Sequence, residues 1–568
     1  MRLMSPSRSR ASKSAHRPPP SPSRGGGGWL RSYRRAWLGG DLAAGVVIVC
    51  LLVPEGMAYA EIAGMPPETA FYVAPPALLL YALFASSRRL VVVVSATQAT
   101  LSASAVAPLA TQGTAEWAAL TAALALLVGL MTIAAGLLRL GAIAQFFSPS
   151  VLTGFVTGLA LVICIKQVPK ILGIESGEGD FFERLWDILA NLGSVHGATL
   201  AVGLITLAVM LGAGRFGHRL PAALIALVVG IAISRIFDLA AHDVEVIEEI
   251  PSGLATPELP DVTLSDISLL AFAALGIFLV NFAEANSVAR AFALRDRAKL
   301  VANRELMGLG AANVGAGLFQ GFTIGASLSK SAAADRAGMQ TQLAGIVAAA
   351  GTVLVALFLT GLFRALPEAT LGAIVVVAVS EMVKVGELRR LYRLRRSDFA
   401  IAAVALVGVL TLETLPALVL AVALSIVLLL YHAAGALVRR LGQLPGGSYG
   451  DVRAHPDARV DSSVLALRPN SELFFANAET VAEQVTDAAS AARPRAVVLD
   501  LESTDELDVP SADALRRLAD RLDDAGIRLA LARVHPEALE MLGRAGVIDA
   551  IGADQVYDRV EDAVMAAG

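Results

Sequence analysis

The sequence predicts an α-helical membrane protein that ends in a small soluble α/β domain. Of its 568 residues, 55% are hydrophobic and only 17% are charged, and the mean hydropathy is +0.64. A soluble globular protein has roughly 25% charged residues, so lipid must solvate most of this chain. Apolar segments with short breaks follow one another from 41 to 435, and the composition changes after Arg439 and Arg440. Cys50 and Cys164 both lie in apolar segments, so no disulfide framework is indicated.

Residues 1–35 predict a disordered basic tail. They contain nine Arg and Lys residues and no acidic residue, together with runs of Pro and Gly. The tail lacks the apolar core of a secretory signal, and the apolar segment after it is long enough to span a membrane, so we expect no cleavage. Its charge predicts that it stays in the cytoplasm.

The region 36–438 is predicted to be the transmembrane part. Basic residues between its apolar segments, including five arginines from Arg389 to Arg396, would face the cytoplasm. Residues 238–266 carry eight acidic residues and no Lys or Arg, and would face outside. This alternation predicts an even number of crossings with both termini in the cytoplasm. The clear apolar candidates are 42–60, 68–84, 115–138, 198–214, 221–236, 267–289, 340–363 and 398–434. The last of these is long enough for two spans.

The segment 319–335, FQGFTIGASLSKSAAAD, lies between apolar segments but is not typical of a membrane helix. Residues 322–324 favour a short extended piece, because aromatic and β-branched side chains lose rotamer freedom in a helix. Gly325 is expected to break this piece. A short helix from about Ala326 would then point its unpaired N–H groups and the positive end of its dipole into the membrane interior.

Polar side chains at the start of that short helix predict an anion site. Ser327 and Ser329 add hydroxyl donors, and Lys330 adds a positive charge one turn in. Three sources of positive potential thus meet at one place, which is how a protein binds an anion away from water. The alternative is a Ser/Ala-rich helix interface with Lys330 extending to the membrane surface.

A second irregular segment has the same composition pattern. The β-branched run LVVVV of 90–94 is followed at 95–100 by small and hydroxyl side chains. Paired interrupted segments indicate an inverted repeat in which two half-helices meet near the membrane midplane. Non-helical backbone at that depth is tolerated only where protein or a cavity satisfies its polar groups.

Five long motifs follow one another along the chain: VPEGMAYAEIAGMPP at 53–67, the segment 146–173, FAEANSVARAFA at 282–293, and the segments 303–322 and 327–346. In this order they resemble the first, fifth, eighth, ninth and tenth-to-eleventh helices of the sulfate permease (SulP) family of anion transporters. The resemblance implies about fourteen transmembrane segments in two inverted halves of seven. These would form a core that carries substrate and a gate against which the core moves.

The resemblance also implies a function. We expect a secondary active transporter of inorganic anions of the sulfate or bicarbonate class, coupled to protons and working by alternating access. The alternatives are sodium-coupled bicarbonate transport and dicarboxylate or chloride transport. A homodimer in the cell (plasma or inner) membrane is implied, with membrane lipids around it, no cofactor and no nucleic-acid partner.

The residues argue against two other classes of function, a regulatory module and an enzyme. A membrane-tethered regulatory module with little transport would be expected to lose the polar residues of both half-helices, which are still present here. An enzyme is not expected, since no nucleophile and base pair, phosphate loop or zinc-ligand cluster stands out.

Carried over by position, the anion site of the family departs from the usual pattern at three places. The family often has Gly-Pro where Ser95 and Ala96 stand. The family usually has Gln where Glu55 stands, and a carboxylate repels an anion unless it is protonated or paired. It often has Arg where Lys330 stands, and Lys offers a point charge instead of a two-pronged fork. The alternative for Glu55 is a residue at a pore lip near water. The site falls on Glu55, Tyr59, Thr97, Gly325, Ala326, Ser327, Leu328, Ser329 and Lys330.

Glu284 falls on the carboxylate that is associated with cation coupling in bacterial members of the family. It lies in the otherwise apolar segment 275–289. Ionised, it would oppose a nearby anion through like charge, whereas a proton or sodium would remove the repulsion. The alternative is a structural carboxylate that is paired with Lys330 or capped by Asn281 or Asn286.

The soluble part begins after a predicted linker at 439–450. Residues 451–568 alternate apolar strands with amphipathic helices, which is typical of a small α/β domain. The run ESTDELDVPSADAL at 502–515 resembles a STAS domain, the usual cytoplasmic appendage of the family. Related domains carry a hydroxyl residue and Gly where Pro510 and Ser511 stand. Proline cannot be phosphorylated, and we expect Ser511 to cap a helix.

Overall fold

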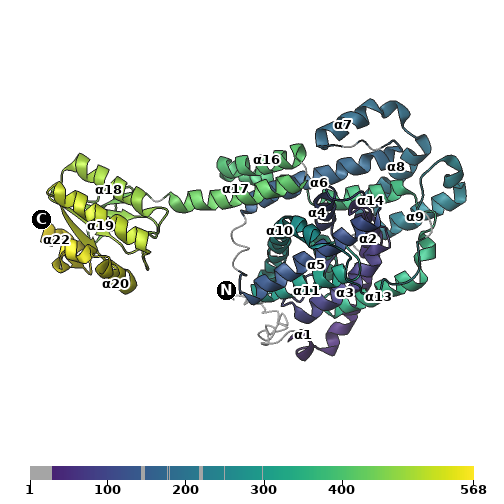
Figure 1. Ribbon diagram of the computed structural model, residues 1–568, viewed down its shortest axis with the longest axis horizontal. Helices are drawn as coiled ribbons and strands as arrows, with labels where there is room; N and C mark the ends of the chain where they lie inside the picture. Colours follow the sequence, from purple (N-terminus) through teal and green to yellow (C-terminus); the bar gives the residue numbers. More distant parts are fainter. Residues whose placement is uncertain are drawn as a thin grey trace, which may run out of the picture. The chain divides into compact units, whose positions relative to one another are not determined.

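The protein is represented by a computed structural model with two compact units, which divide between Ser425 and Ile426. The first unit is mainly helical, as Figure 1 shows. The second contains a six-stranded sheet. Residues 1–27 of the predicted tail lie outside the described residues. The structure describes 28–141, 148–175, 177, 179–215, 222–247, 250–296, 299–412, 414–435 and 437–568.

The end of the predicted tail is folded. Residues Gly28–Arg31 form α1, and Trp29 is buried. Its indole N–H donates a hydrogen bond of 2.9 Å to the carbonyl oxygen of Ala82 in α3 (Thr69–Phe84). The prediction of disorder over 1–35 was wrong for this part, because one aromatic ring finds a buried partner that the basic composition does not indicate.

Apolar helices make up the first unit. Five described stretches are long and apolar enough to cross a membrane: Arg35–Ile62, Ala115–Leu137, Pro149–Leu172, Leu264–Asp296 and Glu368–Leu394. As predicted, 398–434 forms two helices, α16 and α17. Besides α1 and α3, the helices of this unit are α2 (Leu38–Ile62), α4 (Ala96–Val106), α5 (Ala115–Leu137), α6 (Pro149–Leu172), α7 (Phe181–Ala190), α8 (Gly197–Arg215), α9 (Ala222–Phe237), α10 (Leu264–Asp296), α11 (Ala302–Leu318), α12 (Leu328–Arg336), α13 (Leu343–Phe358), α14 (Glu368–Ser380), α15 (Val385–Leu394) and α16 (Arg396–Thr411). Helix α17 (Thr414–Ala434) begins in this unit and runs across the division.

Two short strands interrupt the helical unit. Strands β1 (Val92–Val93) and β2 (Gly325–Ala326) pair in antiparallel orientation. Each strand runs directly into a short helix, β1 into α4 and β2 into α12. The N-terminal ends of α4 and α12 therefore lie beside each other, and the two helices lead away in opposite directions.

The sequence predicted both irregular segments but misplaced the details of the second. The extended piece is Gly325–Ala326 and not 322–324, and α12 begins at Leu328 and not at Ala326. Gly325 is part of the strand and does not break it. The reason is that pairing with β1 decides which residues are extended, and this partner is more than 200 residues away in the sequence.

The helices around the two strands pack in two groups. In one group α2, α3, α5, α10, α11, α12 and α13 contact one another, and in the other α6 packs against α8, α14 and α16. Small residues bring α5 and α11 together, since a Cβ added at Gly129 would lie 2.9 Å from the carbonyl oxygen of Gly310. Helix α2 contacts α13 of the first group and α14 of the second, so it lies where the groups meet.

The second unit is an α/β domain. Its sheet has the order β4-β3-β5-β6-β7-β8, in which β5 to β8 are parallel and β3 is antiparallel to both of its neighbours. The strands are β3 (Val438–Gln443), β4 (Tyr449–Asp451), β5 (Val464–Pro469), β6 (Ala496–Asp500), β7 (Arg528–Ala532) and β8 (Val556–Tyr557). The helices are α18 (Ala478–Ala492), α19 (Val509–Asp524), α20 (Pro536–Arg544), α21 (Val547–Ile551) and α22 (Val560–Ala567).

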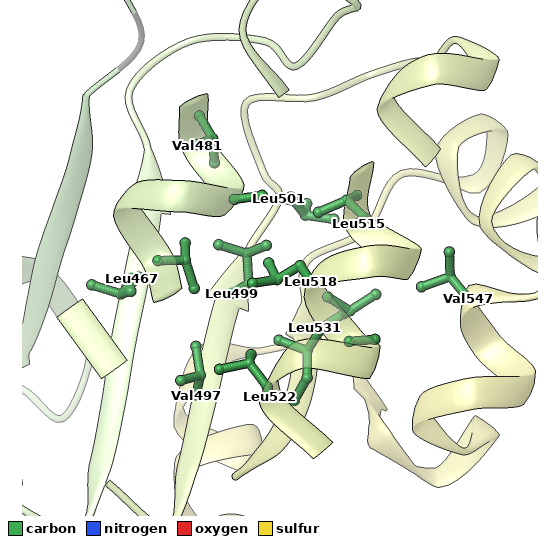
Figure 2. Packing of buried hydrophobic residues seen from close by; sticks show 14 of the residues in the cluster. Leu467, Val481, Val497, Leu499, Leu501, Leu515, Leu518, Leu522, Leu531 and Val547 are labelled. Atoms are coloured by element: carbon green, nitrogen blue, oxygen red, sulfur yellow. The ribbon is translucent and has the colours of Figure 1, made fainter. Parts of the chain in front are cut away.

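Alternation along the strands divides this domain into two cores. Leu467 and Leu499 face one side of the sheet, where Leu518 of α19 packs against them (Figure 2). Ala466 and Val498, one residue earlier in their strands, face the other side and pack against α22. The period of two is thus what places apolar side chains on both faces of a sheet that helices cover on each side.

The predicted linker is wrong for most of its length. Residues 439–450 contain most of β3 and the start of β4, and β3 lies between β4 and β5 in the sheet. Leu441 of β3 is buried. The change of composition after Arg439 and Arg440 suggested a linker, but alternate residues of a strand can face solvent while the strand stays paired.

The predicted helix cap at Ser511 is also wrong. Asp508 is the N-cap of α19, and its carboxylate accepts hydrogen bonds from the backbone N–H groups of Ser511 and Phe475 at 2.9 and 2.7 Å. Partial burial raises the pKa of Asp508, but these hydrogen bonds outweigh burial and hold it below its ordinary value. Ser511 is fully buried, so a kinase would have to open the domain to reach its hydroxyl.

The corrected boundary makes a prediction about fragments of this domain. A fragment that begins at Leu437 keeps β3, whereas one that begins at Asp451 exposes the edge of β5 and loses buried Leu441. Burial of one leucine contributes about 2 kcal/mol, which corresponds to a fall in Tm on the order of 8 °C for a domain of this size. Thermal unfolding followed by circular dichroism measures the difference. Equal Tm values for the two fragments would contradict the placement of β3.

Candidate functional site

The extended segment before α12 is held by two amide side chains. Asn313 of α11 accepts a hydrogen bond from the N–H of Ile324 at 3.0 Å and donates one to its carbonyl oxygen at 3.1 Å. Asn281 of α10 donates a second bond to the same oxygen at 2.7 Å. All three residues are fully buried. Both polar backbone groups of Ile324 are therefore satisfied where no helix satisfies them.

Hydrogen bonds join the segment that precedes α4 to the start of α12. The N–H of Ser327 donates to the carbonyl oxygen of Val91 at 2.9 Å, and the N–H of Val91 donates to the hydroxyl of Ser331 at 2.9 Å. One turn further along α4, the hydroxyls of Ser102 and Thr323 lie 2.6 Å apart. These contacts fix the N-terminal ends of α4 and α12 against each other.

Gly325 is required by close packing between these elements. A Cβ added at this position would lie 2.7 Å from the amide oxygen of Asn281 and 2.9 Å from Cγ of Gln98. Gln98 is fully buried, and neither of its amide atoms has a hydrogen-bond partner within the described residues. Any side chain at 325 would therefore separate α4 from α10 at the level of the site.

Lys330 forms a buried ion pair. It lies in the first turn of α12, only 1% of its surface is exposed, and its ammonium group contacts the carboxylate of Glu55 on α2. The hydroxyl of Tyr59, one turn along α2, donates to the same carboxylate at 3.4 Å. The ammonium also lies 5.1 Å from the centre of the Tyr59 ring. Glu55 is thus a buried partner of Lys330, and the pore-lip alternative for it is wrong.

Glu284 lies on α10, opposite the start of α4. Its carboxylate accepts a hydrogen bond of 3.4 Å from the hydroxyl of Thr97, which is in the first turn of α4. Within the described part of the chain, no Lys or Arg nitrogen lies within 4.0 Å of Glu284. Lys384, in the turn before α15, acts on it only electrostatically. Glu284 therefore lacks the direct counter-charge that Glu55 has.

This geometry does not pair Glu284 with Lys330, and neither Asn281 nor Asn286 caps it. Lys330 pairs with Glu55 and not with Glu284. The amide nitrogen of Asn281 donates to Ile324, and among the described residues no hydrogen bond joins the amide of Asn286 to Glu284.

The remaining predicted residues lie around the start of α12. Ser327 is its N-cap, and its hydroxyl accepts from the N–H of Lys330 at 3.3 Å. The hydroxyl of Ser329 lies 3.4 Å from that of Ser327. Leu328 is 54% exposed and Ala326 is buried in β2. The structure thus brings the predicted residues of α2, α4, α10 and α12 together at one crossing point.

A second group of charges lies where the two helix groups meet. Lys170 near the end of α6 contacts Glu61 at the end of α2 at 2.7 Å and Glu368 at the start of α14 at 3.0 Å. All three side chains are partly buried. The ammonium group therefore links α2 to α6 and α14.

The comparisons with known proteins decide the family. Residues 38–405, well over half of the chain, match the sulfate permease family. The chain belongs to the sulfate permease family. Residues 455–563 match the STAS domain, so this family member carries a C-terminal STAS domain, as the resemblance implied. The family consists of transporters and not of enzymes.

Relatives extend over nearly the whole length of this family member. It is 36% identical to a probable sulfate transporter of Mycobacterium tuberculosis over 545 residues, which covers 94% of this chain and 96% of the relative. Its fold is similar to that of the murine solute carrier 26 family member A9, with a TM-score of 0.86, 23% identity, and coverage of 95% and 93% of the two chains. It is also similar to the transmembrane domain of the cyanobacterial bicarbonate transporter BicA, with a TM-score of 0.61, 23% identity, and coverage of 68% and 98%.

Sequence reasoning missed several residues that build the site. Asn313 was not singled out, and Asn281 was considered only as a cap for Glu284. Both are amides in otherwise apolar segments, and this is the signal that could have found them. The partnership of Glu61 with Lys170 had no comparable signal, because the two residues are 109 positions apart.

The buried ion pair predicts non-additive stability changes. Glu55→Gln and Lys330→Met each leave one buried charge without its partner, which costs about 3–5 kcal/mol. The double variant removes both charges and should unfold at a higher temperature than either single variant. Thermal unfolding in detergent measures this, and Glu116→Gln, which changes an exposed carboxylate in the first turn of α5, is the control with little expected effect. Additive losses in the double variant would show that the pair does not couple.

Proposed function

We propose that this family member is a secondary active transporter that moves an inorganic anion of the sulfate or bicarbonate class together with a proton. Membership of the sulfate permease family supports anion transport. The similarity to a probable sulfate transporter and to a bicarbonate transporter supports these two anion classes. Anion binding at a defined site and coupling to a proton are inferred from the residues that we assign to the site.

The observation that carries the proposal is a buried lysine at the meeting point of two helix N-termini. Unpaired N–H groups and the positive dipole ends of α4 and α12 meet there, beside the ammonium group of Lys330. Ser327 and Ser329 add hydroxyl groups at the start of α12, and Thr97 adds one in the first turn of α4. This combination suits a small anion and offers nothing that would recognise a large organic molecule.

The charges nearest to this point make a co-transported cation necessary. Glu55 and Glu284 each carry one negative charge when ionised, and Lys330 carries one positive charge, so the sum is −1. Lys384 acts on Glu284, Glu381 acts on Glu55 and Lys330, and these two opposite charges leave the sum at −1. An anion that enters adds further negative charge in a site that is largely shielded from water. At least one cation must therefore accompany the anion if binding is to be favourable.

Glu284 is the carboxylate that we assign to the coupling cation. Glu55 is stabilised as a carboxylate by direct contact with Lys330, whereas Glu284 has only the Thr97 hydroxyl and the more distant Lys384. Among the described residues, the charge of Glu284 is therefore the one that no fixed cation contacts directly, which leaves it for a co-transported cation to neutralise. Sodium bound at Glu284 is the alternative, because it would neutralise the same charge.

Alternating access between a core and a gate is part of the proposal. The site residues lie on α2, α4, α10 and α12, while α6 and α14 belong to the other packing group. The contacts of Lys170 with Glu61 and Glu368 join the groups at one end of the helices. We infer that these ion pairs separate when the site opens at that end.

We propose a multi-pass protein of the cell membrane with both termini in the cytoplasm. Arg89 follows α3, and Arg295 and Asp335 lie at the ends of α10 and α12. Both arginines pair with Asp335, so the C-terminal ends of these three helices lie at one end of the helical unit. Placing this basic end inside follows the excess of Lys and Arg in cytoplasmic loops. A homodimer and a regulatory role of the STAS domain are further parts of the proposal.

The experiment that tests the function is uptake into proteoliposomes made with the purified full chain. Labelled sulfate and bicarbonate are offered separately, with chloride and a dicarboxylate as competitors. Each measurement is made with a proton gradient, with a sodium gradient, and with neither. We expect accumulation of one of the two anions with the proton gradient. No flux of any of these anions would contradict the proposal and would favour a regulatory module instead.

Lys330 is predicted to be needed for anion affinity. Lys330→Ala should raise the KM for uptake at least tenfold, and Lys330→Arg should retain most of the affinity while shifting the order of competing anions. The comparison is repeated in a Glu55→Gln background, where no carboxylate is left unpaired. Arg336→Ala, which removes an exposed cation from the same helix, is the control. Unchanged KM in both Lys330→Ala backgrounds would contradict the assigned role.

Glu284 is predicted to couple the proton to the anion. In Glu284→Gln, accumulation driven by an inward proton gradient should be lost, while exchange of anion down its own gradient should survive. The physical reason is that the amide is permanently neutral and no longer gains or loses a proton during the cycle. Uptake is measured with the gradient imposed and then collapsed. A variant that still concentrates the anion when protons drive it would show that another group couples.

A further inference from the structure

Helix α15 is not explained by the transport site. It connects α14 to α16, and none of its ten residues is buried. The helices on either side do contain buried residues: α14 buries every residue from Ala369 to Val375, and α16 buries Ala402, Ala405 and Gly408. A ten-residue helix is about 15 Å long, which is too short to cross a membrane.

The residues of α15 divide into an apolar face and a basic face. Val385, Leu388 and Tyr392 are spaced by three and four residues, so they share one face of the helix. Val385 and Tyr392 are 54% and 52% exposed, and they form no part of the packed interior. Arg389 and Arg393 are four residues apart and share the adjacent face. This is the pattern of a helix that lies at a boundary between lipid and water.

The positive charge of α15 is largely uncompensated. Arg390 pairs with Glu387 at 2.9 Å. Arg389 and Arg393 have no carboxylate within 4.0 Å among the residues that the structure describes. Arg396, two residues beyond the helix, lies 5.9 Å from the ring centre of Tyr392. The helix therefore offers guanidinium groups that are exposed and free to contact anionic groups outside the chain.

The position of α15 in the chain places it at the membrane surface. The apolar helix α14 ends at Ser380 and the apolar helix α16 begins at Arg396, so both leave the membrane next to α15. A soluble acidic partner would cover the arginines but would leave Val385 and Tyr392 in water. The headgroup layer of a membrane accommodates both faces, since acyl chains take the apolar face and phosphates take the basic face.

We propose that α15 lies in the headgroup layer and binds the phosphate groups of anionic phospholipids. Each arginine near an anionic surface strengthens such binding about fivefold. The planar guanidinium groups suit phosphate, because each can donate two parallel hydrogen bonds. The lipid would hold the connection between α14 and α16 against the membrane, independently of which ion the site transports.

The test compares lipid retention by the full chain and its variants. Each protein is purified from an equimolar mixture of phosphatidylglycerol and phosphatidylcholine, and the retained lipids are counted by native mass spectrometry. Replacing Arg389, Arg390 and Arg393 together with Gln should lower the ratio of retained phosphatidylglycerol to phosphatidylcholine at least tenfold. Raising the salt from 50 to 300 mM should weaken retention in the unmodified protein, because salt screens exposed charges.

Two further variants make the outcome decisive. Replacing the same three arginines with Lys keeps the charge and should retain at least half of the phosphatidylglycerol. Replacing the exposed Arg453, Arg495 and Arg544 of the STAS domain with Gln removes the same charge elsewhere and should change nothing. Equal retention by the Arg389 triple variant and the unmodified protein would overturn the proposal. An equal loss in the STAS-domain variant would also overturn it. So would a failure of the Arg389 triple variant to assemble when phosphatidylcholine is the only lipid, because this would indicate a protein partner for the arginines.

Discussion

A chain that leaves helical conformation inside a membrane must hydrogen-bond its free N–H and C=O groups to other parts of the protein, and the rest of this structure depends on that requirement. Asn281 and Asn313 satisfy Ile324, and Ser331 satisfies Val91. These bonds allow α4 and α12 to begin at the same point instead of continuing as full helices. Without them the two positive helix ends could not face one place, and there would be no site.

The charges of the site follow from the same arrangement. The meeting of α4 and α12 creates positive potential, and Lys330 adds to it in surroundings where an unpaired ammonium group would be costly. Glu55 from α2 stabilises this ammonium group, and Glu284 from α10 makes the sum negative. Structural stability in the absence of substrate and the need for a co-transported cation are therefore two results of one set of side chains.

The sequence indicated those parts of this arrangement that depend on neighbouring residues. A β-branched run followed by small and hydroxyl residues predicted both short helices, and an isolated Lys330 predicted the positive site. It did not indicate the partner of Lys330, because Glu55 is 275 residues away and the ion pair exists only once α2 and α12 pack. The strand β3 was missed for a similar reason, since its partners are decided by sheet pairing and not by its own charged residues.

The central claim is that an anion binds at this site only together with a cation, which we assign as a proton on Glu284. The most direct measurement is the number of protons that the purified protein takes up when sulfate or bicarbonate binds, read with a pH indicator in weakly buffered solution. The account predicts net uptake of about one proton per bound anion near neutral pH, and none in Glu284→Gln. Saturable anion binding without proton uptake in the unmodified protein, and in the absence of sodium, would contradict it.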